Sequence, residues 1–287
     1  MDTCGLTAEY NPFHKGHRKQ LAMIRERFGS DAGVIVCLSG PFCQRGVPAL
    51  LDKGVRARLA LSEGADLVLE LPQAFATASA ERFAQGAVLT LLATGVVRNL
   101  AYGSERPSEH ANIRKVAALL ADEPAGFGSQ IRSRIASGTG FAAARSQAVG
   151  HLTKNASFAA LLRHPNTILA VEYEKALFRS DHGVSGVRPQ DWKQTSSIST
   201  HALPLFDKDS LSASAIRDRI WKAVRNRQSQ AYEPLTRDLA RWLPPASLAA
   251  IMDAVTMEQG LLLDEMIAPA LLMSSVFCRL NQLKQIQ

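Results

Sequence analysis

Two histidines near the start of the chain are the residues best suited to chemistry. His14 and His17 enclose Lys15 and Gly16, in the order His-x-Gly-His. Both imidazoles can donate hydrogen bonds to phosphate oxygens, and the glycine between them lets the backbone approach a phosphate closely. Two polar histidines in a surface loop would have the same spacing, so the pattern needs support from the elements around it.

The flanking residues predict that this motif joins a strand to a helix. The apolar run that ends at residues 6–8 is typical of a short buried strand, and Asn11-Pro12 then breaks it. From Gly16 onward, apolar residues recur at the spacing of one helix face, at Leu21, Ile24 and Phe28. A helix N-terminus presents unpaired amides and the positive end of the helix dipole, so it favours an anion. A His-x-Gly-His sequence in this position resembles the nucleotidyltransferase superfamily, whose members move an adenylyl group from ATP.

A second set of candidate phosphate ligands lies far downstream. Ser212 and Ser214 can cap a helix start while pointing hydroxyls and amides at an anion, and Arg217 can fork onto a phosphate. Alone, such a sequence is a capped helix in most proteins. Together with the histidine motif, it resembles the second phosphate-binding signature of the same superfamily. The two motifs are therefore expected to bind one triphosphate.

The composition is that of an ordinary soluble globular protein. The chain has 287 residues, 46% of them hydrophobic and 21% charged, with no run of about 18 apolar residues for a membrane span. No export signal is recognisable, and four scattered cysteines without a CxxC pair favour a reduced, cytoplasmic protein without a zinc site. The net charge of +7 permits an anionic partner such as nucleic acid without requiring one.

Strands and helices alternate over the first hundred residues. Further strands are predicted at 34–38, 66–71 and 97–102, with helices at 52–64 and 80–93. Single helices between short strands indicate right-handed crossovers and a parallel sheet, which is an α/β, Rossmann-like fold. Ligands bind beyond the carboxyl ends of such strands. The histidine loop, the turn at 39–40 and the turn at 103–105 should therefore lie along one edge.

The rest of the chain is expected to be mostly helical. Glycine-rich breaks separate helices predicted at 109–120, 129–135 and 142–149, and another helix starts at Pro165. A fifth strand is expected at 184–188, followed by an irregular polar stretch to about residue 210. We predict an ATP-binding domain of the nucleotidyltransferase type over residues 1–217, with a helical insertion at about 106–178, and a helical C-terminal region over 218–287.

Several longer segments of the sequence indicate one family within this superfamily. They are AEYNPFHKGH at 8–17, SGPFCQRGVPA at 39–49, Asp52-Lys53 with Arg56-Ala57, DLVLELP at 66–72, SAERFA at 79–84, YGSE at 102–105, Pro165-Asn166 with ILAVEY at 168–173, and SASAIR at 212–217. In this order they are similar to the bacterial tRNA(Met) cytidine acetate ligase family. Lys15 and Pro41 stand where that family usually has asparagine. Family members usually carry a longer C-terminal region, so 218–287 is expected to be a shortened tRNA-binding part.

The resemblance implies an ATP-dependent ligase. In the family's reaction, acetate attacks the α-phosphate of ATP to give acetyl-adenylate and pyrophosphate. The acetyl group then passes to the exocyclic amine of the wobble cytidine in elongator tRNA(Met). Such chemistry needs charge neutralised on the transferring group more than covalent help from the protein. The resemblance makes His14, His17 and Arg217 the expected catalytic residues, with the serines of the second motif holding the β- and γ-phosphates.

The same resemblance implies an ATP site built from the loop at 7–17 and from more distant positions. Its expected residues are Thr7, Ala8, Glu9, Tyr10, Asn11, Pro12, Phe13, His14, Gly16, His17, Gly103, Asn166, Lys193, Ser212, Ser214 and Arg217. An asparagine near a helix start, such as Asn166, is as often a simple cap. No carboxylate cluster for a metal is visible, so Mg²⁺ is expected to arrive with ATP.

Two other functions remain open from the sequence. One is a small-molecule adenylyltransferase or acyl-adenylate-forming enzyme of the same fold without an RNA substrate. The other is a non-catalytic RNA-binding relative that retains ATP. The helix after Arg217 carries a row of basic residues that is either a solvated face or a contact surface for tRNA phosphates. These residues are Arg219, Lys222, Arg225 and Arg227.

Overall fold

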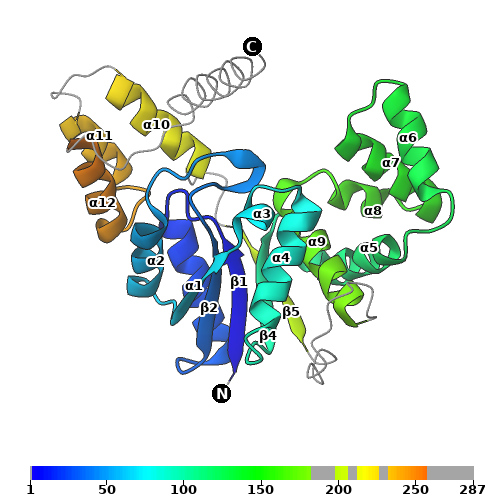
Figure 1. The fold of residues 1–287 in the computed structure, drawn as a ribbon, viewed down its shortest axis with the longest axis horizontal. Helices are drawn as coiled ribbons and strands as arrows, with labels where there is room; N and C mark the ends of the chain where they lie inside the picture. The colour runs from blue at the N-terminus through cyan, green and yellow to red at the C-terminus, as the bar shows by residue number, and fades with distance from the viewer. Residues whose placement is uncertain (1, 182–197, 206–211, 226–231, 257–287) are drawn as a thin grey trace, which may run out of the picture.

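A five-stranded parallel sheet forms the centre of the molecule (Figure 1). The computed structural model describes residues 2–181, 198–205, 212–225 and 232–256. The spatial order is β3-β2-β1-β4-β5, and every neighbouring pair is parallel. The chain order reverses between β1 and β4, and ligands of such sheets bind in the crevice at this point. The strands are β1 (Thr3–Ala8), β2 (Gly33–Ser39), β3 (Leu67–Leu71), β4 (Asn99–Ser104) and β5 (Ser199–Pro204).

Helices cover both faces of the sheet. One face carries α1 (Lys15–Phe28) and α2 (Lys53–Ser62), and the other carries α4 (Ala80–Leu92) and α9 (Pro165–Asp181). Leu6 of β1 belongs to the core with Leu21 of α1, whereas Cys37 of β2 belongs to the opposite core with Leu91 of α4. Because side chains alternate along a strand, a sheet buried on both faces needs apolar residues at nearly every strand position. The apolar runs that predicted the first four strands have this origin.

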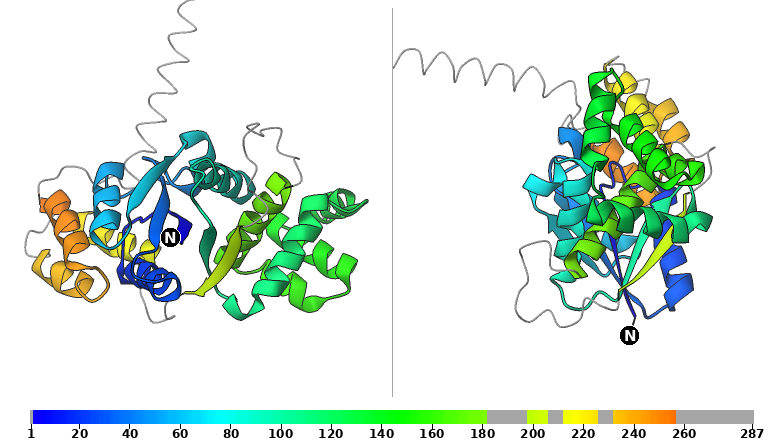
Figure 2. Two further views of the ribbon diagram at one scale, coloured as in Figure 1. Left: turned by 90° about the horizontal axis from the view of Figure 1, so that it is seen from below. Right: turned by 90° about the vertical axis from the view of Figure 1, so that its right-hand side faces the viewer.

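The remaining helices extend the molecule at two opposite ends, as Figure 1 and the left view of Figure 2 show. At one end lie α5 (His110–Asp122), α6 (Phe127–Ala136), α7 (Phe141–Thr153) and α8 (Ala156–Leu161). At the other end lie α10 (Ala213–Arg225), α11 (Tyr232–Leu239) and α12 (Pro245–Thr256), and a short α3 (Gln73–Ala76) precedes α4. None of the helices in the described ranges has the length and apolar content to cross a membrane.

The helices α10 to α12 pack onto the sheet through the core that contains α1. Ile220, Leu239 and Ile251 are fully buried members of this core, together with Leu21. The described C-terminal helices therefore share a hydrophobic core with the parallel sheet. The domain boundary after residue 217 stays a prediction.

The edge strand β5 lies where the sequence predicts an irregular polar stretch, and that prediction is wrong for residues 199–204. Only Thr200 and Leu203 are buried in β5, because an edge strand has one side without a neighbour. A proline such as Pro204 is tolerated at such an edge. The strand predicted at 184–188 lies outside the described residues.

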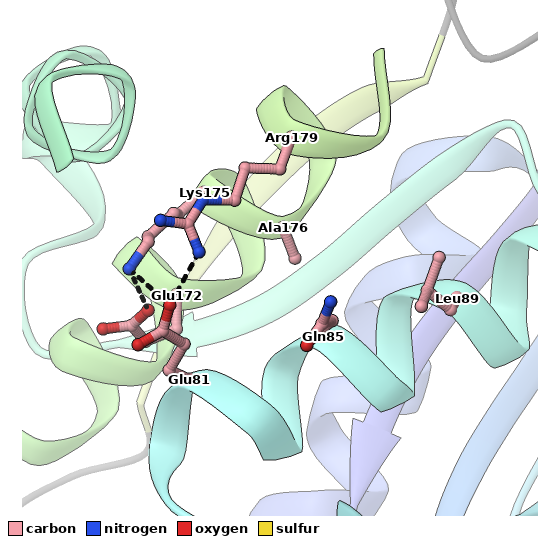
Figure 3. A pocket seen from close by; sticks show the side chains of 7 residues that line it. All are labelled: Glu81, Gln85, Leu89, Glu172, Lys175, Ala176 and Arg179. Carbon is pink, nitrogen blue, oxygen red and sulfur yellow. Dashed lines mark hydrogen bonds and ion pairs between the residues drawn. The ribbon is translucent and has the colours of Figure 1, made fainter. Parts of the chain in front are cut away.

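A cluster of ion pairs fastens α4 to α9 (Figure 3). Glu81 of α4 accepts hydrogen bonds from Lys175 Nζ at 2.8 Å and from Arg179 Nη1 at 2.7 Å. Glu172, whose side chain is only 1% exposed, pairs with Arg145 of α7 at 2.5 Å. The Glu81 contacts therefore hold α9 against α4, and the buried Glu172–Arg145 pair holds α9 against α7. The start of α9 in turn borders the candidate site.

Candidate active site

The His-x-Gly-His motif forms the junction between β1 and α1. His14 is the N-cap of α1, and its Nδ1 accepts a hydrogen bond from Gly16 N at 3.1 Å. His17 Nδ1 accepts a hydrogen bond from His14 N at 3.2 Å. The two histidines thus form a reciprocal capping box at the helix start. Their rings are stacked, with centroids 3.7 Å apart and planes 18° apart.

These caps determine where each imidazole carries its proton. A ring nitrogen that accepts a hydrogen bond is unprotonated, so neutral His14 and His17 carry their proton on Nε2. Burial lowers the pKa of His14 to about 4. Burial, and then the neighbouring His14, lowers the pKa of His17 well below its ordinary value. At neutral pH both rings are therefore uncharged Nε2–H donors, which suits hydrogen bonding to phosphate oxygens.

A cavity of about 250 Å³ opens beyond the carboxyl ends of β1 and β4. It lies at the position where the strand order reverses, in accordance with the rule for open parallel sheets. His17 and Arg217 both line it, although they come from opposite ends of the chain. Tyr10 also lines the cavity, and its hydroxyl is fully buried without a hydrogen-bond partner among the described residues.

The helix α10 brings Arg217 of the serine–arginine motif to the same cavity. Arg217 Nη1 donates a hydrogen bond to Asn11 O at 2.7 Å. Asn11 is fixed in turn, since its Oδ1 accepts from Leu50 N at 2.7 Å. Ser212 Oγ accepts from Ala215 N at 3.2 Å and so caps α10, whose first residue, Ala213, lines the cavity. The amide-rich start of α10 therefore opens toward the space beside the histidines.

Lys15 connects the histidine motif to the C-terminal helices. Its Nζ donates to Ala240 O at 2.9 Å and to Arg241 O at 3.0 Å. Its main-chain N donates to Trp242 O at 2.9 Å. Both carbonyls follow directly on the C-terminal end of α11, where the helix dipole favours a cation. The lysine in the place of the family's usual asparagine thus holds the segment between α11 and α12 against the start of α1.

A carboxylate holds Asn166 at the start of α9. Glu105 Oε1 accepts from both N and Nδ2 of Asn166 at 3.0 Å, and its Oε2 accepts from N and Oγ1 of Thr167 at 2.8 Å. Burial tends to raise the pKa of Glu105, but these hydrogen bonds outweigh it and lower the pKa. The Asn166 amide is thus a donor to Glu105, and the residue is fixed beside the cavity.

A deeply buried arginine organises the loops around the cavity. Arg56 of α2 is fully buried, and its Nη1 donates to Glu9 O at 2.6 Å and to Ser39 O at 3.0 Å. Its Nη2 donates to Gly40 O at 2.5 Å, and its Nε donates to Leu51 O at 3.0 Å. One guanidinium therefore joins the loop after β1 to the loop after β2. Burial lowers the pKa of Arg56, and nearby carboxylates such as Asp52 oppose this effect.

The structure brings together most of the residues expected at the ATP site. The expected residues that line the cavity are Thr7, Ala8, Glu9, Tyr10, Asn11, His17, Gly103, Asn166 and Arg217. The other expected residues that the structure describes do not line the cavity; they are Pro12, Phe13, His14, Gly16, Ser212 and Ser214, of which Phe13 is fully buried in the core. Lys193 lies outside the described residues.

Sequence reasoning missed part of the lining. The missed residues are Gln20, Gln44, Phe83, Tyr102, Leu169, Tyr173, Leu205 and Ala213. Phe83 lies on α4 and Tyr173 on α9, where helix periodicity marks them only as core positions. Leu205 closes over Gly103, because a Cβ there would lie 2.6 Å from Leu205 Cδ2. The family-like segments contain six of these residues, all except Gln20 and Leu205, and were the sequence signal that could have found them.

Comparison with known proteins agrees with this geometry. The family model described as HIGH Nucleotidyl Transferase matches residues 1–287. The chain belongs to this family. Its fold is similar to that of a solved structure. This is the crystal structure of Thermotoga maritima TmcAL bound with alpha-thio ATP, with a TM-score of 0.75 and 33% identity, over 92% of this chain and 58% of that one.

Curated relatives of this HIGH nucleotidyl transferase carry the name tRNA(Met) cytidine acetate ligase. The protein of Syntrophomonas wolfei is 36% identical over 263 residues, which is 89% of this chain and 61% of that protein. The protein of Halothermothrix orenii is 38% identical, over 82% of this chain and 56% of that protein. The protein of Clostridium tetani is 40% identical, over 77% and 54% respectively. The chain thus spans little more than half the length of these relatives.

Proposed function

We propose that this chain is an ATP-dependent ligase that activates acetate as acetyl-adenylate. It then transfers the acetyl group to the wobble cytidine of elongator tRNA(Met), forming N4-acetylcytidine. The observation that carries this proposal is the meeting of His17 and Arg217 at one cavity. The relatives' name and the alpha-thio ATP bound by the Thermotoga maritima protein support the choice of ligase and nucleotide.

The site supplies hydrogen-bond donors for attack at the α-phosphate of ATP. Acetate oxygen forms a bond to phosphorus as the bond to pyrophosphate breaks, so negative charge shifts onto the leaving group. The neutral Nε2–H groups of His14 and His17 and the guanidinium of Arg217 stabilise this charge from fixed positions. Because the two rings are held by the helix cap, little reorganisation is needed when the charge moves.

The start of α10 is assigned to the β- and γ-phosphates. Ser212 and Ser214 stand there, and their hydroxyl oxygens are 2.9 Å apart. A helix N-terminus with free amides and hydroxyls is a suitable anion site. In the described ranges, no three His, Cys, Asp or Glu side chains come together as metal ligands. Mg²⁺ is therefore proposed to be bound mainly by the phosphates and water.

The decisive experiment measures the two half-reactions separately. Exchange of labelled pyrophosphate into ATP that depends on acetate reports the formation of acetyl-adenylate. Mass analysis of tRNA after incubation with ATP, acetate and the protein reports acetyl transfer. The proposal expects both signals, with N4-acetylcytidine confined to the wobble position of elongator tRNA(Met).

The alternative functions give different results in the same experiment. Exchange without transfer to tRNA would indicate an acyl-adenylate enzyme with a small-molecule acceptor. An absence of exchange under all conditions, with retained ATP binding, would indicate a non-catalytic relative. A cytoplasmic location, and elongator tRNA(Met) and acetate as partners, belong to the proposal and are tested with it.

A further inference from the structure

The transfer half-reaction of the proposed function needs a group that accepts a proton. The cytidine amine attacks the carbonyl carbon of acetyl-adenylate, a C–N bond forms, and the C–O bond to AMP breaks. AMP leaves with the electron pair, and the nitrogen must lose one proton. Because the lone pair of this amine is delocalised into the cytosine ring, the amine is a weak nucleophile, and removal of its proton by a positioned base accelerates the step.

Most titratable residues of the cavity lining cannot accept this proton at neutral pH. His17 receives the His14 amide on Nδ1 and already carries its proton on Nε2, with a lowered pKa. Burial raises the pKa values of the Tyr10, Tyr102 and Tyr173 phenols, so all three stay protonated and are poor acceptors. Arg217 is a permanent cation. Among the described residues of the lining, this leaves Glu9, whose side chain is a carboxylate.

Glu9 is held in place for such a role. It is the residue that follows β1, at the switch point of the sheet, and it is half-buried. Its main-chain oxygen accepts from Arg56 Nη1 at 2.6 Å, and its Oε1 accepts from Gln44 N at 2.7 Å. These contacts fix both the backbone and the side chain. The carboxylate therefore has a defined position at the cavity wall, on the side of the loop after β2.

Two groups near Glu9, the Cys43 thiol and the Tyr173 phenol, do not compete with it for the proton. Burial, followed by the charge of Glu9, raises the pKa of the Cys43 thiol to about 11, so the thiol stays protonated. Burial chiefly raises the pKa of the Tyr173 phenol, and Glu9 adds to this effect. Arg56, behind the loop, provides a positive charge that favours the ionised carboxylate.

We propose that Glu9 is the general base of acetyl transfer. Its carboxylate takes the proton from the exocyclic amine as the C–N bond forms and later releases it to solvent. This assignment rests on the proposed function, because it concerns the second half-reaction of the same site. The residues of the site then have separate roles. His14, His17 and Arg217 stabilise negative charge on the phosphates, and Glu9 accepts the proton of the cytidine amine.

The test compares Glu9→Gln with the parent protein in the two half-reactions. Glutamine keeps an oxygen that can accept from Gln44 N but cannot take a proton at neutral pH. We expect tRNA acetylation to fall about 100-fold more than acetate-dependent pyrophosphate exchange, in the range typical of a missing general base. Hydroxylamine is a stronger nucleophile than the cytidine amine, so trapping of the acetyl group as hydroxamate should fall far less than tRNA acetylation.

The pH dependence of acetyl transfer distinguishes a general base from a residue that only supports the loop. The parent's transfer rate should decline on the acidic side as Glu9 becomes protonated, and Glu9→Gln should lose this decline. Glu9→Asp keeps a carboxylate and should recover part of the transfer rate. Equal losses in exchange, trapping and transfer would overturn the assignment and leave Glu9 as a loop anchor. A parent protein that exchanges pyrophosphate but never acetylates tRNA would overturn the proposed function itself, and the assignment with it.

Discussion

Arg217 of α10 donates a hydrogen bond to the main-chain oxygen of Asn11 at 2.7 Å and so joins segments 206 residues apart. The contact ties the loop after β1 to the start of α10 on the rim of one cavity. Each half of the proposed phosphate site therefore depends on the other for its position. Changes at either half should affect ATP use, even where the altered side chain is not itself a phosphate ligand.

Replacement of His17 by alanine should abolish acetate-dependent pyrophosphate exchange. The change removes an Nε2–H donor, and loss of one such donor lowers rates by roughly 10²–10³. It also removes the acceptor for the His14 amide, at a cost of about 1 kcal/mol in the free energy of unfolding. Exchange is measured with labelled pyrophosphate, and stability is measured by urea unfolding.

Two variants separate these effects of His17. His17→Asn offers an oxygen that can accept from the His14 amide, so it should be more stable than His17→Ala. Its activity should stay low, because the shorter asparagine side chain cannot place a donor where the Nε2–H group of His17 lies. His151→Ala removes an exposed histidine on α7 and should leave exchange at the parent rate. Exchange at the parent rate in His17→Ala would remove His17 from the mechanism.

Replacement of Arg56 by methionine should destabilise the fold strongly. Four main-chain carbonyls lose their donor in the buried space between the loops after β1 and β2. Since one unpaired buried polar group costs about 1–3 kcal/mol, we expect a decrease of ~3 kcal/mol or more in the free energy of unfolding. Arg58→Met, an exposed change on the same helix, should alter stability by no more than about 0.5 kcal/mol. Similar results for the two variants would contradict the role of Arg56.

The sequence was sufficient to predict β1 to β4 and the helices between them. Strands buried on both faces require continuous apolar runs, and glycine or proline ends these runs sharply, so their bounds are readable. The Asp52 side chain caps α2 through Gly54 N at 2.7 Å, as its position before the helix predicts. The strand–breaker–helix order around His14 likewise predicted the site loop.

Other features depend on interactions that no local pattern records. The polar strand β5 is stabilised by pairing with β4 along one edge, so its own sequence carries little strand signal. Arg56 belongs to a family-like segment, but its place among apolar positions of α2 does not indicate that it is buried or that its partners lie in the loops after β1 and β2. Tyr173 has helix periodicity that predicts burial but not which cavity it borders. Glu9 was expected only as part of the ATP loop, and its proposed role follows from the state of its neighbours.

Acidification should destabilise the protein between about pH 6.5 and about pH 4. In the folded state, burial lowers the pKa of His14 to about 4, whereas an unfolded histidine has a pKa near 6.5. In this interval the unfolded state binds more protons, so the free energy of unfolding rises with pH. The contribution is complete above about pH 6.5 and disappears as the pH falls toward 4. His17, with a pKa lowered in the same direction, adds to the slope.

Urea unfolding at pH 7.5, 6 and 5 measures this slope. His14→Asn keeps a side-chain oxygen for the helix cap but does not titrate, so its slope should be shallower than that of the parent. Glu105 has a lowered pKa in the folded state, so its contribution to the free energy of unfolding is lost only at more acidic pH, below the usual pKa range of carboxylates. If the free energy of unfolding of His14→Asn depends on pH as steeply as that of the parent, the buried neutral imidazole of His14 is not the cause of the pH dependence.

The basic face of α10 should contribute to tRNA binding. Arg219 pairs with Asp238 of α11 but keeps 40% of its side chain exposed, and Lys222 is exposed. Arg225 ends the helix, and Arg227 lies outside the described residues. Replacing Arg219, Lys222 and Arg225 by alanine should weaken binding. It should also reduce the slope of log affinity against log salt by about 0.7–0.9 for each tRNA phosphate that the variant no longer binds.

The control for this prediction matches the change in charge at a distant surface. Arg132, Lys154 and Arg163 are exposed in the helical region at the opposite end of the molecule, and their replacement by alanine removes the same three charges. If attraction by net charge alone governs binding, both triple variants lose affinity equally. If the face of α10 binds phosphates, only its variant shows the reduced salt slope, while pyrophosphate exchange without tRNA is little affected. Unchanged affinity in the α10 variant would assign that face to solvent.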